Sequence, residues 1–231
     1  MSAASPAGLR FLETEKGTYP LQEFRLPLAG REWRLMHAGL VLTPEDEQQY
    51  FQEVLGHLPF GVALWPAAIA LAYELATRET ALSGARVLEL GSGTGLPGLI
   101  AAALGAQVVQ TDRHPLAMSV CQQNAQLNGV EGIDYRLVDW TDWQDGVHYD
   151  WIMGSDILYS PALHPYVDRI FRSSLAPGGR VLISDPLRSP TVRFLQSLEE
   201  QGWRVTMTRW DLGDNEQPRT IGVFELTRPA G

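Results

Sequence analysis

The second half of the chain alternates apolar, strand-like segments with helical ones, and this rhythm restricts the folds open to it. From Ala85 onward five such strands read RVLEL, QVVQT, IDYRLVD, YDWIMGSD and RVLISD. Most of the segments between them are long enough for a helix that crosses from one strand to the next. The pattern is typical of βαβ units on a parallel sheet. We therefore predict an α/β fold with a doubly wound, Rossmann-like sheet.

The last two apolar segments of the chain break this rhythm. WRVTMTRW and TIGVFELT are separated only by DLGDNEQPR, which is too short for a helical crossover. We expect these two strands to pair antiparallel, as a hairpin that ends the sheet.

The N-terminal segment does not show this alternation of strands and helices. Residues 1–17 are expected to form a loosely held tail. The stretch EFRLPLAGREWRLMH alternates apolar and polar residues on both sides of Ala29-Gly30, which predicts a β-hairpin. Pro27 lacks an amide hydrogen and therefore indicates an edge strand.

Two helices are expected before the alternating part. Thr43-Pro44-Glu45-Asp46 has the residue types of a helix start, so we predict a helix from there to about His57. A second helix is predicted from Trp65-Pro66 to about Thr80. We expect residues 1–58 to be an appendage, comprising tail, hairpin and helix, and residues 59–231 to be the main domain.

The stretch VLELGSGTGLPG carries a glycine-rich loop that can be read in two frames. Gly91, Gly93 and Gly95 spell GxGxG, the loop of a methyl-donor site, and here the strand ends at Leu90. Gly93, Gly95 and Gly98 spell GxGxxG, the loop of a dinucleotide site, in which the first glycine closes the strand. The second frame would extend the strand through Gly91 and Ser92, which is a weak strand ending, so the first is favoured.

Glu89 supports the same choice, because a buried central strand is nearly all apolar and a carboxylate there is costly unless a cation or hydrogen-bond donor meets it. S-adenosylmethionine offers an α-ammonium and a sulfonium, whereas a pyrophosphate would be repelled. A plain ion pair of Glu89 with a nearby arginine is the structural alternative.

Acidic and aromatic residues follow the next two strands. Asp112 ends the second strand and could accept hydrogen bonds from both ribose hydroxyls of NAD or of S-adenosylmethionine. Asp139 could accept from an adenine amino group, and Trp140 could stack on the ring. The alternative for these two is a loop acid and a core aromatic.

Taken together, VLELGSGTGLPG, Asp112, the Asp139-Trp140 pair and SDILY at 155–159 resemble the class I, seven-β-strand methyltransferases. More narrowly, GVALWPAA, the LELGSGTGLPG loop and the Asp156-x-x-Tyr159 motif resemble the protein-lysine methyltransferases that modify chaperones and other cellular proteins. The resemblance runs from about Gly61 to the C-terminus. It implies a sheet of order 3-2-1-4-5-7-6 with strand 7 antiparallel, in agreement with the terminal hairpin.

The resemblance also implies the residues of the site. Donor contacts are expected from Trp65, Glu89, Gly91, Gly93, Gly95, Asp112, Asp139, Trp140 and Ser155. Asp156 and Tyr159 are expected at the mouth, as the catalytic residues that meet the acceptor. A helix cap is the alternative for Asp156, and a core ring is the alternative for Tyr159.

The residues after the fifth strand leave the acceptor open. SDPLR is closer to the form found in electron-transfer-flavoprotein lysine methyltransferases than in chaperone-directed ones. Asp185 and Arg188 are weaker site candidates, and a mutual ion pair is an equal explanation for them.

The composition limits which ligands and partners are expected. A net charge of -9 without a basic cluster argues against nucleic acid, and SDILY is not the motif of nucleic-acid amino-methyltransferases. The single Cys121 is expected to be a buried thiol, and the histidine spacing predicts no metal. Without a signal-like start or a bilayer-length apolar run, we expect a cytoplasmic protein away from membranes, with a monomer favoured.

The leading hypothesis is an S-adenosylmethionine-dependent enzyme that methylates a protein lysine and releases S-adenosylhomocysteine. A small-molecule N- or O-methyltransferase is the first alternative. An NAD-dependent oxidoreductase and a non-catalytic donor-binding module are the others.

Overall fold

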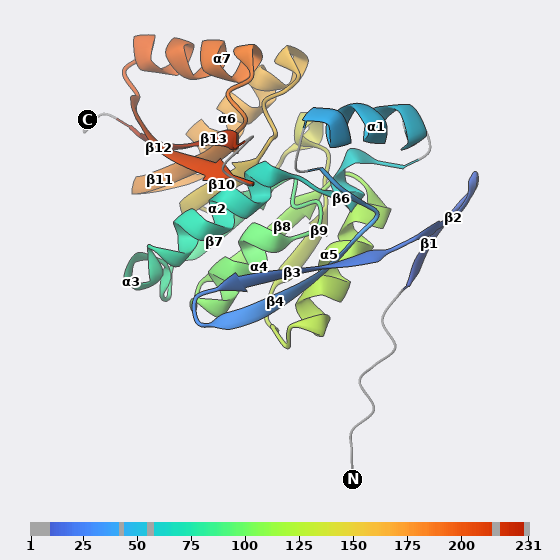
Figure 1. The fold of residues 1–231 in the computed structure, drawn as a ribbon. Helices are drawn as coiled ribbons and strands as arrows, with labels where there is room; N and C mark the ends of the chain where they lie inside the picture. Colours follow the sequence, from blue (N-terminus) through green and yellow to red (C-terminus); the bar gives the residue numbers. More distant parts are fainter. Residues whose placement is uncertain (1–9, 42–43, 55–57, 214–217, 229–231) are drawn as a thin grey trace.

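A seven-stranded sheet forms the centre of the molecule in a computed structural model, which describes residues 10–41, 44–54, 58–213 and 218–228 (Figure 1). The strands are β7 (Arg86–Leu90), β8 (Gln107–Asp112), β9 (Asp134–Leu137), β10 (Tyr149–Ser155), β11 (Leu175–Asp185), β12 (Arg204–Leu212) and β13 (Arg219–Thr227). Their spatial order is β12-β13-β11-β10-β7-β8-β9, and β13 is antiparallel to both of its neighbours. This is the order 3-2-1-4-5-7-6 expected from the sequence, including the terminal hairpin.

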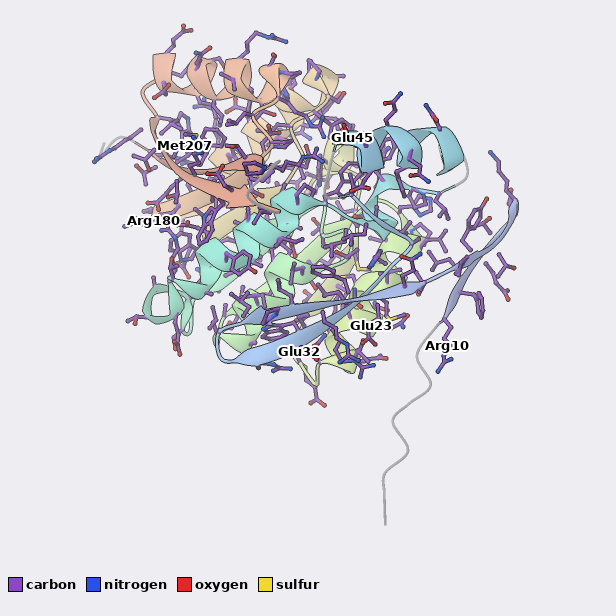
Figure 2. All side chains as sticks on the ribbon, in the orientation of Figure 1. Arg10, Glu23, Glu32, Glu45, Arg180 and Met207 are labelled. Atoms are coloured by element: carbon purple, nitrogen blue, oxygen red, sulfur yellow. The ribbon has the colours of Figure 1, made fainter. Side chains whose placement is uncertain are left out.

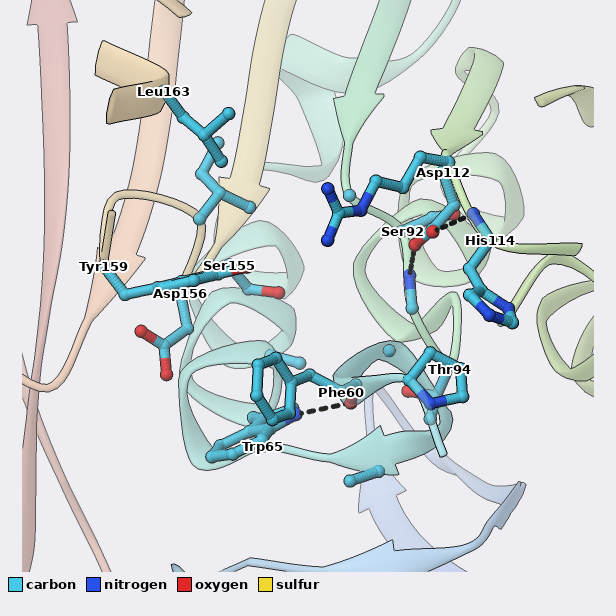
Figure 3. Close-up of a pocket in the computed structure, with 18 of the residues that line it drawn as sticks. Phe60, Trp65, Ser92, Thr94, Asp112, His114, Ser155, Asp156, Tyr159 and Leu163 are labelled. Atoms are coloured by element: carbon cyan, nitrogen blue, oxygen red, sulfur yellow. Dashed lines mark hydrogen bonds between the residues drawn. The ribbon is translucent and has the colours of Figure 1, made fainter. Parts of the chain in front are cut away.

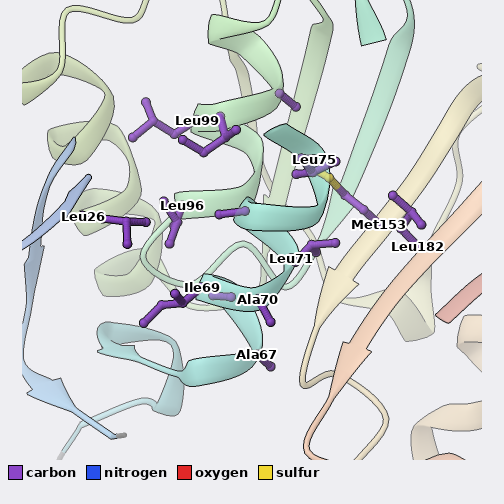
Figure 4. Packing of buried hydrophobic residues seen from close by; sticks show 14 of the residues in the cluster. Leu26, Ala67, Ile69, Ala70, Leu71, Leu75, Leu96, Leu99, Met153 and Leu182 are labelled. Carbon is purple, nitrogen blue, oxygen red and sulfur yellow. The ribbon is translucent and has the colours of Figure 1, made fainter. Parts of the chain in front are cut away.

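Helices cover both faces of the sheet. One face packs against α2 (Pro66–Ala76), α4 (Leu96–Ala103) and α5 (Pro115–Leu127), and the other against α6 (His164–Ser174) and α7 (Ser189–Glu200). Side chains alternate between the two layers along each strand. Val87 belongs to the α2 and α4 core, part of which is drawn in Figure 4, whereas Leu88 and Leu90 belong to the core under α6 and α7.

The described part of the expected tail is folded, so that prediction is wrong beyond residue 9. β1 (Phe11–Thr14) and β2 (Gly17–Pro20) form an antiparallel hairpin. Leu12 is buried in a small apolar cluster with Leu21, Leu58 and Val62, and this burial stabilises strands too short to be recognised from their pattern.

The predicted hairpin over residues 23–37 is confirmed. β3 (Gln22–Leu28) pairs with β4 (Arg31–His37), and the turn residues Ala29 and Gly30 both have positive φ, as tight hairpin turns require. Asn124 on α5 and Asn128 at the C-terminal cap of this helix hydrogen-bond to the main chain of β4 at Met36 and Arg34. These amides attach the hairpin to the main domain. Its charged side chains, such as Glu23 and Glu32, project outward (Figure 2).

The remaining elements are short segments between the hairpin and the sheet or between the elements of the main domain. They are β5 (Gly39–Leu40), α1 (Pro44–Val54), η1 (Phe60–Val62), β6 (Ala63–Leu64), α3 (Glu79–Leu82), η2 (Trp140–Asp142) and η3 (Pro161–Leu163). The predicted helices correspond to α1 and to α2 followed by α3. The expected cap Thr43 and helix end His57 lie outside the described residues. Within the described ranges no helix is long and apolar enough to cross a membrane.

Candidate active site

A cavity of about 730 Å³ opens at the carboxyl ends of β7, β8 and β10, the edge where open α/β sheets bind ligands. Its wall comes from the loops after these strands, from the turn after β9 and from residues 58–65. The predicted site residues that line it are Trp65, Gly91, Gly93, Asp112, Asp139, Trp140, Ser155, Asp156 and Tyr159. The structure thus brings together nine of the eleven residues expected from the sequence.

The glycine loop adopts the GxGxG frame. β7 ends at Leu90, and the three glycines that follow have φ values of 65° at Gly91, 54° at Gly93 and 82° at Gly95. This left-handed region is open to glycine at little cost. Gly98 lies inside α4, where an added Cβ would be 2.3 Å from Gln110 Nε2, so it is a packing glycine. Because β7 stops before Gly91, the strand does not extend through Gly91 and Ser92 as the dinucleotide frame requires.

Glu89 lies behind the loop and not in the cavity, which corrects its expected contact with the donor. Strand alternation turns its side chain toward α4, on the same face as Val87. There Glu89 Oε2 accepts hydrogen bonds from Gly98 N at 3.1 Å and from Gln110 Nε2, its cross-strand neighbour, at 2.6 Å. Burial raises the pKa of Glu89 to about 8. Glu89 therefore holds the loop and the start of α4 together.

Gly95 is also absent from the cavity wall. It precedes α4 in the left-handed conformation, and an added Cβ would be 2.5 Å from Cys121 Sγ. Its contribution is the shape of the loop. Cys121 is a buried thiol, as expected, and donates to Gln110 Oε1. Burial raises the pKa of Cys121 well above its usual value.

Asp112 presents a nearly buried carboxylate to the cavity. Its Oδ2 accepts from Gly93 N at 3.1 Å and its Oδ1 from His114 N at 2.9 Å, so it fixes the loop and the start of α5. Burial raises its pKa. The His114 ring caps α5 by accepting from Leu116 N, which assigns it a structural role.

Asp139 lines the cavity and also caps η2 by accepting from Thr141 N at 2.9 Å, and its contact with an adenine amino group stays a prediction. Hydrogen bonds from Thr141 lower the pKa of Asp139. Trp140 is half-buried and lies against the loop, since a Cβ on Gly91 would be 3.3 Å from its Cζ2. An aromatic face in this position suits the stacking of a planar ring.

Aromatic and polar residues face Asp112 from the other side of the cavity (Figure 3). Tyr159 is 43% exposed and meets Phe60 edge to face, with ring centroids 6.3 Å apart. Phe60 meets Trp65 in the same way at 6.4 Å, and Trp65 Nε1 donates to Phe60 O at 2.9 Å. Tyr159 is therefore a wall of the mouth and not a core ring.

Asp156 is held by an arginine. It has a φ of 52°, its amide donates to Ser184 O, and its carboxylate accepts from Arg188 Nε at 2.9 Å and Nη2 at 3.0 Å. Arg188 therefore pairs with Asp156 and not with Asp185. Asp185 is buried outside the cavity and accepts from Arg188 N and from Thr191 Oγ1. Burial raises the pKa of Asp185 to about 6.

Several lining residues were not expected from the sequence. They are Glu47, Phe60, Gly61, Ser92, Thr94, Arg113 and Arg188, the last considered only as a weaker candidate. Ser92, Thr94 and Arg113 are next to expected residues in the chain, so sequence position could have found them. Glu47 comes from the N-terminal segment, which carried no recognisable motif. Phe60 and Gly61 lie at the start of the main domain, where Gly61 is the first residue of the GVALWPAA motif. Among the described residues no group of three or more His, Cys, Asp or Glu side chains is arranged to hold a metal.

Solved structures with a similar fold include methyltransferases. Ribosomal protein L11 methylase from Lactobacillus delbrueckii subsp. bulgaricus matches with a TM-score of 0.55 and 25% identity, over 71% of this chain and 79% of that one. A structure described as a DhpI-SAH complex has a TM-score of 0.55 and 18% identity, over 79% and 92%. The fold is therefore the class I, seven-β-strand methyltransferase fold.

Curated relatives narrow this class. Protein N-lysine methyltransferase METTL21A of Xenopus tropicalis is 36% identical over 55% of this chain and 62% of the relative. Histone-arginine methyltransferase METTL23 of Mus musculus is 32% identical over 46% and 44%, and EEF1A lysine methyltransferase 3 of Xenopus tropicalis is 26% identical over 79% and 81%. The match thus spans less than two thirds of METTL21A and less than half of METTL23. A profile of the family described as lysine methyltransferase matches residues 45–201, and the chain belongs to that family.

Proposed function

We propose that the chain is an S-adenosylmethionine-dependent methyltransferase whose acceptor is the side-chain amine of a protein lysine. The main observation behind the proposal is a single cavity whose two halves are lined by different kinds of residues. A glycine loop and a buried acid form one half, and Asp156 with aromatic residues forms the other (Figure 3).

The residues of the first half fit the methyl donor. The loop at Gly91 and Gly93 has no side chain to block a ligand from its main chain, and Asp112 supplies carboxylate oxygens suited to ribose hydroxyls. Trp140 supplies an aromatic face for adenine. A volume of about 730 Å³ is within the range of sites for small molecules and cofactors. These residues, with Ser155, would hold the donor.

When bound, S-adenosylmethionine supplies a methyl group on a sulfonium that is already activated for displacement. The protein's part is then mainly to hold the acceptor nitrogen in line and to exclude water. Asp156 offers a carboxylate that attracts a cationic side chain and accepts hydrogen bonds from its nitrogen. Phe60 and Tyr159 form an apolar wall beside it, and the proton of a lysine ammonium can leave to water from the open mouth.

A protein acceptor is supported by the family and by the exposure of the mouth residues. Tyr159 and Phe60, which line the cavity, are among the large apolar side chains that the described structure leaves exposed. A small-molecule enzyme would instead enclose its acceptor in a compact pocket.

Arginine is a second candidate acceptor. The carboxylate of Asp156 already binds a guanidinium through two hydrogen bonds, which shows that its surroundings accommodate this group. One of the relatives is named as a histone-arginine methyltransferase.

The test is to incubate the chain with methyl-labelled donor and a protein extract, then to hydrolyse the labelled protein to amino acids. Label in methyl-lysine supports the proposal, and label in methyl-arginine supports the second candidate. Label confined to small molecules after protein precipitation would refute both. An Asp156→Asn variant, which keeps the volume but removes the charge, is expected to lose most of the transfer.

A further inference from the structure

Four charged side chains from four parts of the fold meet at the mouth of the cavity. Asp156 follows β10, Arg188 precedes α7, Glu47 lies in the first turn of α1, and Arg219 begins β13. Arg188 Nη2 donates to Glu47 Oε1 at 3.0 Å as well as to Asp156, and Arg219 Nη2 donates to Glu47 Oε2 at 2.5 Å. Two carboxylates and two guanidiniums thus form one chain in which the charges balance.

Asp156 has both carboxylate oxygens occupied within this network. Its side chain is only 9% exposed, against 28% for Arg188. A cationic acceptor that approaches the cavity therefore finds the carboxylate already paired. Unless Arg188 leaves, this four-residue network offers no net charge to attract the acceptor, and a second cation beside the guanidinium would be repelled.

The backbone has an unfavourable conformation at Asp156 and at Leu187, the residue before Arg188. Three described residues other than glycine have positive φ. Ala29 belongs to the hairpin turn, whereas Asp156 and Leu187 belong to the ion pair or directly precede it. Such conformations are unfavourable for residues with a Cβ and tend to mark functional positions.

We propose that Arg188 is a resident counter-ion which the cationic side chain of the acceptor displaces from Asp156, while Glu47 retains the released guanidinium. This inference rests on the proposed function, because it concerns the acceptor of that reaction. Arg188 is a positioning and specificity residue in this account, and α1 takes part in acceptor binding through Glu47.

The exchange is feasible because it leaves no charge unpaired. Removing one partner of a buried ion pair is costly, but replacing one cation by another on the same carboxylate avoids that cost. Glu47 already bonds to Arg188, so the guanidinium does not have to find a new partner. An uncharged competitor gains nothing at Asp156, and the network therefore selects cationic acceptors.

The opposite view is that Arg188 is a fixed counter-ion that never leaves. Arg188→Met keeps the apolar stem and removes the charge. If Arg188 competes with the acceptor for Asp156, its removal strengthens cation binding, whereas if Asp156 depends on Arg188 for its orientation, its removal weakens binding or leaves it unchanged. The Arg188 Nε–H resonance of the unmutated chain then distinguishes a displaced guanidinium from a fixed one.

The experiment measures binding of n-butylammonium, a lysine side-chain analogue, to the S-adenosylhomocysteine-saturated chain by NMR titration at constant ionic strength. We expect Arg188→Met to bind the probe about tenfold more tightly than the unmutated chain, which corresponds to about 1.4 kcal/mol. Arg188→Lys is expected to restore the weaker binding. In an Asp156→Asn background, Arg188→Met is expected to have no effect.

Arg219→Met is the matched control, because it removes a guanidinium from Glu47 but leaves Asp156 paired. We expect it to change probe affinity less than twofold. Equal or weaker binding by Arg188→Met would overturn the proposal, as would an equal gain in Arg219→Met. These measurements do not require methyl transfer, so their failure is distinguishable from failure of the proposed function.

The unmutated chain gives a second measurement in case a variant does not fold. Displacement breaks the hydrogen bond from Arg188 Nε to Asp156, so saturating n-butylammonium is expected to shift the Nε–H resonance of Arg188 and to accelerate its exchange with water. An unmoved resonance at saturation would overturn the proposal.

Discussion

Substitution of Glu89 by glutamine tests how the glycine loop is held. Glu89 is fully buried, its Oε2 accepts two hydrogen bonds, and its Oε1 has no hydrogen-bond partner among the described atoms. Glutamine has nearly the same shape and keeps one acceptor for the same two donors, but it does not ionise. The variant therefore separates the charge of Glu89 from its hydrogen bonds.

The expected effect depends on pH. Burial raises the pKa of Glu89 from 4.5 to about 8, so between these values the side chain is ionised in the unfolded chain and protonated in the folded one. Folding then takes up a proton, and the stability of the folded state falls as pH rises through this window. At 1.36 kcal/mol per pKa unit, the whole difference corresponds to about 5 kcal/mol at most.

The stability of Glu89→Gln does not fall in this way as pH rises, because glutamine does not ionise. We expect its free energy of unfolding, relative to that of the unmutated chain, to rise by about 3 kcal/mol between pH 5 and pH 8. The assay is urea unfolding followed by tryptophan fluorescence at both pH values. Glu200→Gln, at an exposed position of α7, is the control and should show no such change. A stability difference for Glu89→Gln that is the same at both pH values would refute the reasoning, because Glu89 would then be ionised in the folded state.

Two further predictions concern the loop and the aromatic wall. Gly95→Ala should destabilise the fold by about 2 to 4 kcal/mol and weaken S-adenosylhomocysteine binding, because it adds a clash with Cys121 to the cost of positive φ. Gly129→Ala has a similar φ with open space around it and should lose only about 1 kcal/mol in urea unfolding; equal losses would contradict this account. Trp140→Ala should weaken S-adenosylhomocysteine binding about 5- to 150-fold in calorimetry, as expected for the loss of about 1 to 3 kcal/mol of stacking. Trp140→Phe should retain most of the affinity, and unchanged binding by Trp140→Ala would exclude stacking.

The fold was largely predictable because its signals are local. Strand and helix patterns recur from Ala85 onward, and the short DLGDNEQPR connection determines the antiparallel ending. The β1–β2 hairpin was missed because its stability comes from contacts of Leu12 with residues distant in sequence. Strand periodicity could have placed Glu89 correctly, since it shares a strand face with Val87 and therefore points toward α4.

The lining residues that belong to sequence motifs could be predicted, whereas those contributed by distant segments of the chain could not. Asp112, Trp140 and Asp156 follow strands whose carboxyl ends meet at one edge. By contrast, the pairing of Asp156 with Arg188 and of Arg188 with Glu47 joins residues 32 and 141 positions apart. Local patterns do not encode such contacts, which depend on how α1 and the sheet pack together.

The central claim is that the glycine loop and Asp112 form a methyl-donor site. Its most direct test is calorimetric titration of the chain with S-adenosylhomocysteine and, separately, with NAD. The account predicts saturable binding of one S-adenosylhomocysteine per chain, weakened in Trp140→Ala, and no binding of NAD. Binding of NAD without binding of S-adenosylhomocysteine would contradict it.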